Sequence, residues 1–189
     1  MPRTQTAADG NRLLAALPRK DRRRLAAGCE PVTLLLGEAL AEPGECIHHV
    51  YFPTESFVSL TTPTDSGATL EVGLVGNEGM LGISLILGVD FAPLHALVQG
   101  EGTALRMNTA TFRRELGRSR ALDRGMKRYL YVLMSQIAQT AVCTHFHLVE
   151  ARLARWLLMT HDRAHSDGFH VTHEFLAYTL GVRRVGVTK

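Results

Sequence analysis

The sequence predicts an α+β protein in which an antiparallel β-roll of the jelly-roll type precedes a long helix and a C-terminal helix-turn-helix. Three observations predict this order. Short apolar runs alternate with Gly, Pro, Asp and Ser between residues 28 and 107, and apolar residues recur at helical spacing between residues 121 and 145. The segment 173–189 then places a glycine between two short helical patterns. We therefore expect three parts, residues 1–108, 109–147 and 148–189.

The composition excludes several classes of protein. Hydrophobic residues make up 46% of the 189 residues and charged residues 21%, as in ordinary globular proteins. The apolar stretches are too short to cross a membrane or to form the core of a signal peptide, so we expect a cytoplasmic protein without a membrane partner. The scattered Cys29, Cys46 and Cys143 form neither a disulfide framework nor a CxxC pair, and they are too few for an iron–sulfur cluster.

The net charge of +3 is divided unevenly along the chain. Residues 25–105 contain ten acidic residues and no lysine or arginine. Residues 1–24 carry seven basic and two acidic residues, and residues 106–189 carry fourteen basic and six acidic ones. This division makes the basic C-terminal part a candidate for binding a polyanion, and solvated helix faces are the alternative.

Local signals predict each element of the β-roll. Residues 11–27 form one or two short helices, because Pro18 separates LLAAL from RKDRRRLAA and suits a helix start. The glycines of GLVGNEGMLG, residues 73–82, predict tight turns. The predicted strands are VTLLL, CIHHVYF, SFVSLTT, ATLEVGLV, HALVQ and TALRM.

Two helices are expected after the roll. Asn108 or Thr109 caps a short helix through TFRREL that we expect to end at Gly117, and a long helix spans residues 121–145. Residues along the long helix recur at alternating spacings of four and three, as in the seam of a coiled coil. The predicted seam is Met126, Leu130, Leu133, Ile137, Thr140 and Thr144. Its narrowness favours contact with a second copy in a homodimer, and packing on the chain's own β-roll is the alternative.

The C-terminal part has the residue pattern of a helix-turn-helix. After the helix LVEARLARWLLMTHDRA, Thr172 is placed to cap HEFLAYTL, Ala177 is small enough for a close crossing, and Gly181 suits the turn. The apolar residues expected in the shared core are Leu176, Leu180, Val182 and Val187. Arginines at the start of the second helix would reach guanine edges or phosphates of DNA, and a surface αα-hairpin is the alternative. The predicted DNA-binding residues are Thr172, Arg183, Arg184, Thr188 and Lys189.

A second hypothesis takes the printed end at Lys189 literally. The second helix would then stop after about two turns, without a wing. On this hypothesis the chain is a dimeric ligand-binding or interaction module that does not hold DNA.

In combination, these motifs resemble the Crp/Fnr family of bacterial transcription regulators. The segments that carry the resemblance are VYFPTESFVSL, EVGLVGNEGMLG, RLARWLLMTHDR and EFLAYTLGVRRVGVT, in this order. The resemblance implies a cyclic-nucleotide-binding-type β-roll, a dimerisation helix, a winged helix-turn-helix that reads a palindromic operator in double-stranded DNA, and RNA polymerase as a partner. It also implies that Arg184 reads a base and Lys189 makes a second basic contact. Val185 replaces the glutamate of cyclic-AMP-responsive members, so their DNA sequence preference does not carry over.

The resemblance also locates an effector pocket, but with altered chemistry. Cyclic-AMP-responsive members carry Gly-Glu followed by Arg-Ser/Thr-Ala, where this sequence has Gly82-Ile83 and Leu94-His95-Ala96. Because residues 25–105 also lack lysine and arginine, we expect an unknown effector that is more apolar than cyclic AMP, or a vestigial pocket. Protonated His95 or the backbone N–H groups of the glycine-rich turn are the weaker alternative for holding a phosphate. The expected pocket residues are Glu71, Glu78, Gly82, Ile83, Leu94, His95, Ala96, Ile137 and Ala138.

Other chemistry has weaker support. Cys143, His145 and His147 group three soft ligands without an evident fourth, and His48 and His49 face opposite sides of a strand. Nine histidines leave haem ligation open, but no motif favours it. The sequence contains no Walker loop, nucleophile elbow or HExxH motif. We therefore expect neither an enzyme nor a resident metal or cofactor.

Overall fold

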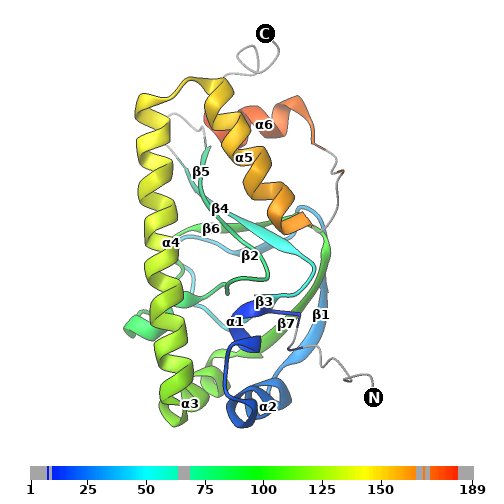
Figure 1. Ribbon diagram of the computed structural model, residues 1–189, viewed down its shortest axis with the longest axis vertical. Helices are drawn as coiled ribbons and strands as arrows, with labels where there is room; N and C mark the ends of the chain where they lie inside the picture. Colours follow the sequence, from blue (N-terminus) through cyan, green and yellow to red (C-terminus); the bar gives the residue numbers. More distant parts are fainter. Residues whose placement is uncertain (1–7, 9, 64–68, 165–167, 169–170, 183–189) are drawn as a thin grey trace.

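Two antiparallel sheets form a β-roll, and the computed structural model describes it with its surrounding helices over residues 8, 10–63, 69–164, 168 and 171–182. One sheet has the order β1–β7–β3 and the other β2–β6–β4–β5 (Figure 1). The strands are β1 (Glu30–Leu34), β2 (Ala39–Ala41), β3 (His49–Pro53), β4 (Phe57–Pro63), β5 (Thr69–Val75), β6 (His95–Gly100) and β7 (Gly102–Asn108). All six predicted strands are confirmed. The additional strand β2 has three residues, too few for an alternating pattern.

The core of the roll is built mainly from side chains that point between the two sheets. β4 is the most buried strand, and its first five residues are all buried. One face of β4 lines the interior of the roll, while Ser59 on the other face bonds to a residue under the C-terminal helices. The Phe52 and Phe112 rings, 6.4 Å apart, join the roll to the helix that follows β7. Large core side chains include Val50, Phe52, Val58, Val98, Leu105, Met107 and Phe112. Each such side chain contributes roughly 1.5–3 kcal/mol when fully buried.

Short helices close the lower end of the roll. The predicted pair is confirmed as α1 (Arg12–Ala15) and α2 (Arg19–Ala27), with Pro18 at the N-cap of α2. Asn108 caps α3 (Thr109–Arg118) by accepting a hydrogen bond from the Thr111 N–H. The expectation that α3 ends at Gly117 is wrong. The helix continues to Arg118, because the Ser119 side chain then caps the next helix through the Leu122 N–H.

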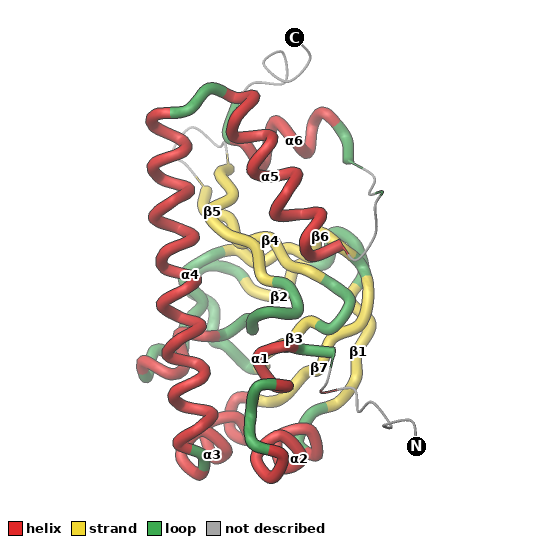
Figure 2. The backbone as a smooth tube through the Cα atoms, in the orientation of Figure 1, coloured by secondary structure: helices red, strands yellow, loops and turns green. Residues whose placement is uncertain are grey.

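Three further helices complete the fold. The long helix α4 (Arg120–Phe146) runs beside the roll for its whole length, as Figures 1 and 2 show. α5 (Val149–Ala164) turns back from the far end of α4 and passes across the sheet that contains β4 and β5. α6 (His173–Leu180) lies beside β5. No helix in the described part of the chain is both long and apolar enough to cross a membrane.

Met126 and Leu133 of the predicted seam of α4 pack in the chain's own core, which corrects their assignment to a dimer contact. Met126 is fully buried and Leu133 is 7% exposed, both within the single chain. Leu130, Ile137 and Thr140 are half-buried, and only Thr144 is exposed. The physical reason is that the more apolar stripe of the helix gains most from burial, and the roll core is the largest apolar surface available to it.

Candidate functional site

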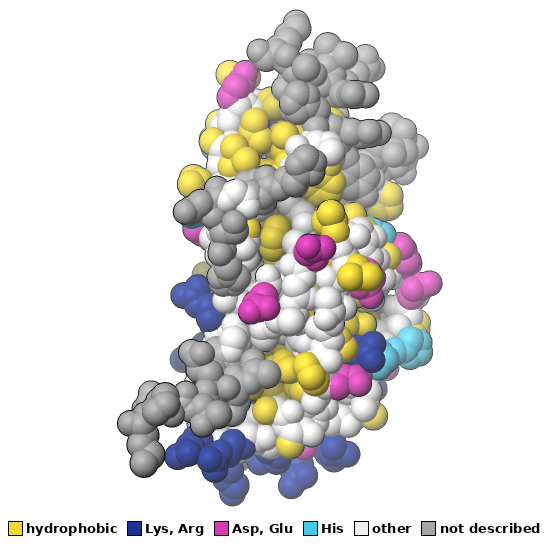
Figure 3. Space-filling view, turned by 90° about the vertical axis from the view of Figure 1, so that its right-hand side faces the viewer, with side chains coloured by type: hydrophobic (Ala, Val, Ile, Leu, Met, Phe, Trp, Pro, Cys, Tyr) yellow, Lys and Arg dark blue, Asp and Glu magenta, His cyan; other side chains and the backbone are white. Residues whose placement is uncertain are grey.

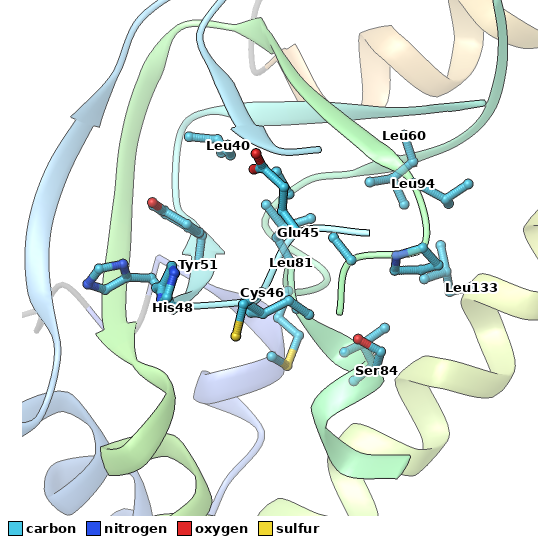
Figure 4. Close-up of a pocket in the computed structure, with 18 residues that line it drawn as sticks. Leu40, Glu45, Cys46, His48, Tyr51, Leu60, Leu81, Ser84, Leu94 and Leu133 are labelled. Atoms are coloured by element: carbon cyan, nitrogen blue, oxygen red, sulfur yellow. The ribbon is translucent and has the colours of Figure 1, made fainter. Parts of the chain in front are cut away.

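A cavity of about 220 Å³ lies inside the roll beside α4. Its wall includes the β2–β3 region, residues 80–84 at the start of the short helix η2 (Ile83–Leu87), and residues 92–94 before β6. Leu60 of β4 and Leu133 of α4 complete it. Figure 4 shows Leu60, Leu94 and Leu133 together on one side of it. Gly82 begins η2 in the left-handed region at φ +90°, and a Cβ there would lie 3.0 Å from Val50 Cγ1. A glycine at this position is therefore required both by the backbone angle and by the space.

Only part of the predicted pocket lines this cavity. Gly82, Ile83 and Leu94 do so. His95 instead pairs with Glu42, with 2.8 Å between its Nδ1 and Glu42 Oε2, and Ala96 is buried within β6. Most of the wall was not predictable from the sequence pattern, because its residues come from several separate segments. From β2, β3 and the irregular connection between them come Leu40, Ala41, Glu45, Cys46, Ile47, His48, His49 and Tyr51. The other unpredicted lining residues are Leu60, Met80, Leu81, Ser84, Ala92, Pro93 and Leu133.

The two predicted α4 contributors to the pocket are also placed differently. Ile137 packs against the hydrophobic core without lining the cavity, and Ala138 is exposed on the outer face of α4. The residue of α4 that does reach the cavity is Leu133, four residues before Ile137. The cavity therefore borders both the roll and the long helix.

The cavity is chemically suited to an uncharged, largely apolar ligand. No lysine or arginine is among its lining residues, and its titratable members are Glu45, Cys46, His48, His49 and Tyr51. A phosphodiester anion placed here would lose its hydration without gaining a fixed cation, at a cost of several kcal/mol. Among the side chains that the structure describes, no three His, Cys, Asp or Glu residues come together to hold a metal ion.

Glu71 lies outside the cavity, under the C-terminal helices, which corrects its assignment to the effector pocket. It projects from β5, is 7% exposed, and accepts a hydrogen bond of 2.6 Å from Ser59 Oγ. Burial raises the pKa of the Glu71 carboxyl to about 8, although hydrogen bonds from Ser59 and Trp156 and the charges of Arg163 and Arg155 act to lower it. A neutral carboxyl is therefore enclosed between the roll and α5.

Glu78 is the second predicted pocket residue that faces α5 instead. Its Oε1 accepts hydrogen bonds from Arg163 Nη2 at 2.6 Å and from Arg163 Nε at 2.9 Å. The Arg163 side chain is only 11% exposed, so this ion pair is largely shielded from water. A Cβ on Gly76 would lie 2.8 Å from Arg163 Cγ, which explains the glycine at that turn. The pair ties α5 to the glycine-rich turn of the roll.

A capped helix and a glycine turn lie where the sequence predicts the start of the helix-turn-helix. Thr172 caps α6, because its Oγ1 accepts a hydrogen bond from the Phe175 N–H at 3.1 Å. Gly181 adopts φ +61°, and the Val182 N–H donates to the Ala177 carbonyl at 3.0 Å, which is the Schellman pattern of a helix end. Arg152 of α5 donates to the Leu180 carbonyl. The helix cap and the glycine turn are thus confirmed at the predicted positions.

The remaining predicted residues of this motif lie outside the described part of the chain. They are Arg183, Arg184, Val187, Thr188 and Lys189. Within the described part, the Trp156 and Phe175 rings lie 6.3 Å apart and join α5 to α6. Trp156 is 4% exposed, so the two helices share a small core on the outer face of β5.

The exposed face of α4 carries a second row of residues at spacings of four and three. Each member follows a residue of the predicted seam by one position. The members of this second row are Lys127, Tyr131, Met134, Ala138, Ala141 and His145, all of them exposed. Tyr131 is 73% and Met134 60% exposed, and Phe146 beside this face is 73% exposed. A shift of one residue turns the face by about 100° around the helix. Tyr131 and Met134, followed by the small Ala138 and Ala141, form an exposed apolar stretch of the kind that is found at interfaces.

Comparison with solved structures identifies the fold. The chain is similar to the c-di-GMP-responsive global regulator CLP of Xanthomonas campestris, with a TM-score of 0.73 and 15% identity over 90% of this chain and 88% of that one. It is similar to a Crp/Fnr-family regulator from Eubacterium rectale, with a TM-score of 0.75 and 13% identity over 95% and 84%. A Crp/Fnr-family regulator from Thermus thermophilus gives a TM-score of 0.67 and 18% identity over 84% and 82%.

These likenesses show that the chain has the fold of Crp/Fnr transcription regulators. At identities of 13–18% they show the fold and leave the ligand and the DNA site open. No protein-family model and no curated protein sequence matches the chain.

Proposed function

We propose that the protein is a dimeric, sequence-specific DNA-binding transcription regulator whose β-roll binds an uncharged apolar effector. The observation that carries this proposal is the Thr172 cap and the left-handed Gly181 turn of α6, attached to a roll and long helix of the Crp/Fnr fold. This turn is where a recognition helix would start, and Arg183 and Arg184 follow it directly in the sequence.

Replacing Arg184 by alanine is expected to reduce the difference in affinity between the preferred duplex and random duplexes. An arginine that bonds to two acceptors of a guanine contributes about 1–3 kcal/mol of discrimination, so binding to the preferred duplex should weaken roughly 5- to 150-fold. Binding to random duplexes should change little. The measurement is fluorescence anisotropy with both duplexes at matched salt.

Arg12→Ala is the matched control for that experiment. It removes the same charge from an exposed position on α1, far from α6 in the fold. We expect it to leave both affinities unchanged. Equal sequence preference in wild type and Arg184→Ala would place the reading helix elsewhere.

The effector is proposed to occupy the 220 Å³ cavity. Cyclic AMP and c-di-GMP both carry phosphates, and no cation among the lining residues meets them, so the c-di-GMP response of CLP is not expected here. Two contacts connect α4 with the roll near the cavity. Leu133 of α4 lines the cavity, and the Leu74 N–H of β5 donates to Gln136 Oε1 of α4 at 2.7 Å. An effector in the cavity could therefore change the position of α4 relative to β5. Regulation then requires different affinities for two arrangements of the dimer.

Thermal unfolding distinguishes the two classes of ligand. An uncharged apolar probe, N-phenyl-1-naphthylamine, at a hundred times its dissociation constant should stabilise the fold by about 2.7 kcal/mol. For a chain of 189 residues this raises the melting temperature by roughly 5–10 °C.

Cyclic AMP and c-di-GMP should leave the melting temperature unchanged. Leu94→Gln, which places an amide in the cavity wall, is the control and should reduce the shift from the apolar probe. Stabilisation by cyclic AMP and none by the apolar probe would contradict the assignment. RNA polymerase as a partner stays a prediction from the resemblance. The three-part division of the chain stays a prediction from the sequence pattern.

A further inference from the structure

A dense group of cations covers the end of the molecule opposite α6. We call it the basic pole and define it by α2, α3 and the first turns of α4. It contains Arg19, Lys20, Arg22, Arg23, Arg24, Arg113, Arg114, Arg118, Arg120, Arg124, Lys127 and Arg128. Only Asp21, Glu115 and Asp123 oppose this charge on the same elements. Figure 3 shows lysines and arginines gathered at that end.

The three acids are already engaged, so most of the charge faces solvent. Glu115 is buried and bonds to Arg24, which also contacts Asp21 at 3.0 Å. Asp123 pairs with Lys127 at 2.8 Å. Within the described residues, several pole cations form no ion pair: Arg19, Lys20, Arg23, Arg120, Arg124 and Arg128. All six of these are exposed. Such a surface attracts polyanions from a distance.

The chemistry of the pole fits phosphate better than a protein or lipid surface. Ten of its twelve cations are arginines, whose planar fork pairs with phosphate through two hydrogen bonds. None of the large apolar side chains that are exposed in the described structure lies on α2, on α3 or before Tyr131 of α4. Apolar and aromatic side chains are the usual anchors of protein interfaces and of helices that lie in a membrane surface, so a surface of cations alone favours a polyanion.

The pole also continues the exposed face of α4. At alternating spacings of four and three, the row Tyr131, Met134, Ala138 extends backwards through Lys127, Arg124 and Arg120. In a parallel dimer on this face, which rests on the proposed function, the basic ends of both helices would lie near each other. Their mutual repulsion would be relieved by a bound polyanion.

The pole is too far from α6 to share one short DNA site with it. α4 has 27 residues, which is about 40 Å at 1.5 Å per residue. Duplex DNA has a persistence length of about 150 base pairs and does not bend back over that distance within one operator. We propose that the basic pole binds the phosphate backbone of a second duplex segment, without sequence preference.

The test compares three variants for binding to a random-sequence duplex by anisotropy over a range of salt. The pole variant Arg120→Gln, Arg124→Gln, Arg128→Gln should bind at least about tenfold more weakly at low salt. Its slope of log K against log salt should fall by about 2.7 if three phosphate contacts are lost. The matched control with lysine at the same three positions keeps the charge and should retain most of the affinity.

The variant Arg183→Ala, Arg184→Ala separates this proposal from the proposed function. It should lose preference for a selected duplex and keep the pole-dependent affinity for random duplex. If the chain does not read a DNA sequence but the basic pole does bind duplex, only the glutamine variant should bind the duplexes more weakly. The lysine variant and the Arg183→Ala, Arg184→Ala variant should then bind like wild type. Unchanged affinity and salt slope in the glutamine variant, with the dimer and helicity intact, would overturn the proposal. Tight binding of poly-glutamate without duplex binding would also overturn it and assign the surface to an acidic protein.

Discussion

Replacing Glu71 by glutamine is expected to abolish a pH-dependent loss of stability that reaches up to about 5 kcal/mol in the wild-type chain. The loss arises because the pKa of the Glu71 carboxyl is about 8 in the folded protein against an ordinary value of 4.5. Below pH 4.5 the Glu71 carboxyl is protonated in both the folded and the unfolded protein, so the free energy of unfolding is at its highest with respect to this group. As pH rises towards 8, only the unfolded chain releases the proton, so the free energy of unfolding falls. Above that pH both states are ionised and the fall ends.

Urea unfolding of wild type and Glu71→Gln from about pH 5 to about pH 9 measures this difference directly. The two proteins should have similar stability at the acid end, and the glutamine variant should be the more stable at the alkaline end. Glu101→Gln removes an exposed carboxyl and is the control that should keep the wild-type slope. A glutamine variant with the same slope as wild type would show that Glu71 does not stay neutral under α5.

The same substitution reports on the docking of the C-terminal helices. Trp156 is the single tryptophan of the sequence and lies beside Glu71 at 4% exposure. Ionisation of Glu71 favours states in which water reaches the carboxylate, so α5 and α6 should leave β5 more often as pH rises through 8. Trp156 emission should then shift to longer wavelength in wild type and stay constant in Glu71→Gln.

Replacing Met134 by glutamate is expected to raise the dimer dissociation constant by about 100-fold or more. Met134 is 60% exposed in the single chain, so a carboxylate there stays in contact with water. On the proposed dimer face two unpaired carboxylates would be buried opposite each other. Affinity for a palindromic duplex should fall with the dimer, because the two reading units no longer bind as one.

Sedimentation equilibrium of Met134→Glu and Gln139→Glu tests the location of the dimer face. Both variants add one negative charge at exposed positions of α4, five residues apart, and only the first lies on the proposed face. Circular dichroism checks that α4 stays helical in both. Equal dimerisation of the two variants would mean that the interface uses another surface.

The two stripes of α4 show what spacing alone leaves undecided. The rows that begin at Met126 and at Lys127 have the same alternation of four and three residues. Periodicity predicts the long helix correctly but does not say which row the roll covers and which row remains exposed. Hydrophobicity favours the row of Met126 and Leu133, and the roll takes that row because it offers the larger apolar surface.

Local rules predict the α6 turn well, whereas the surroundings of Glu71 depend on tertiary packing. A threonine cap, a small residue and a glycine act within ten residues of each other, so their roles can be read from the sequence. The family resemblance predicts Glu71 in the cavity, but the residue lies under α5 because β5 turns that face outwards. The sequence signal was an acidic residue within an apolar strand, LEVGLV, which indicates a specific partner but not where it lies.

Selection of duplexes from a random library tests the regulator account most directly. Repeated binding and sequencing should enrich two half-sites related by a two-fold axis, with centres about one or two helical turns apart. The enrichment should disappear for Met134→Glu and lose one or more base preferences for Arg184→Ala. A library that stays random after selection, with a protein that is folded and dimeric, would contradict the claim that the chain reads DNA.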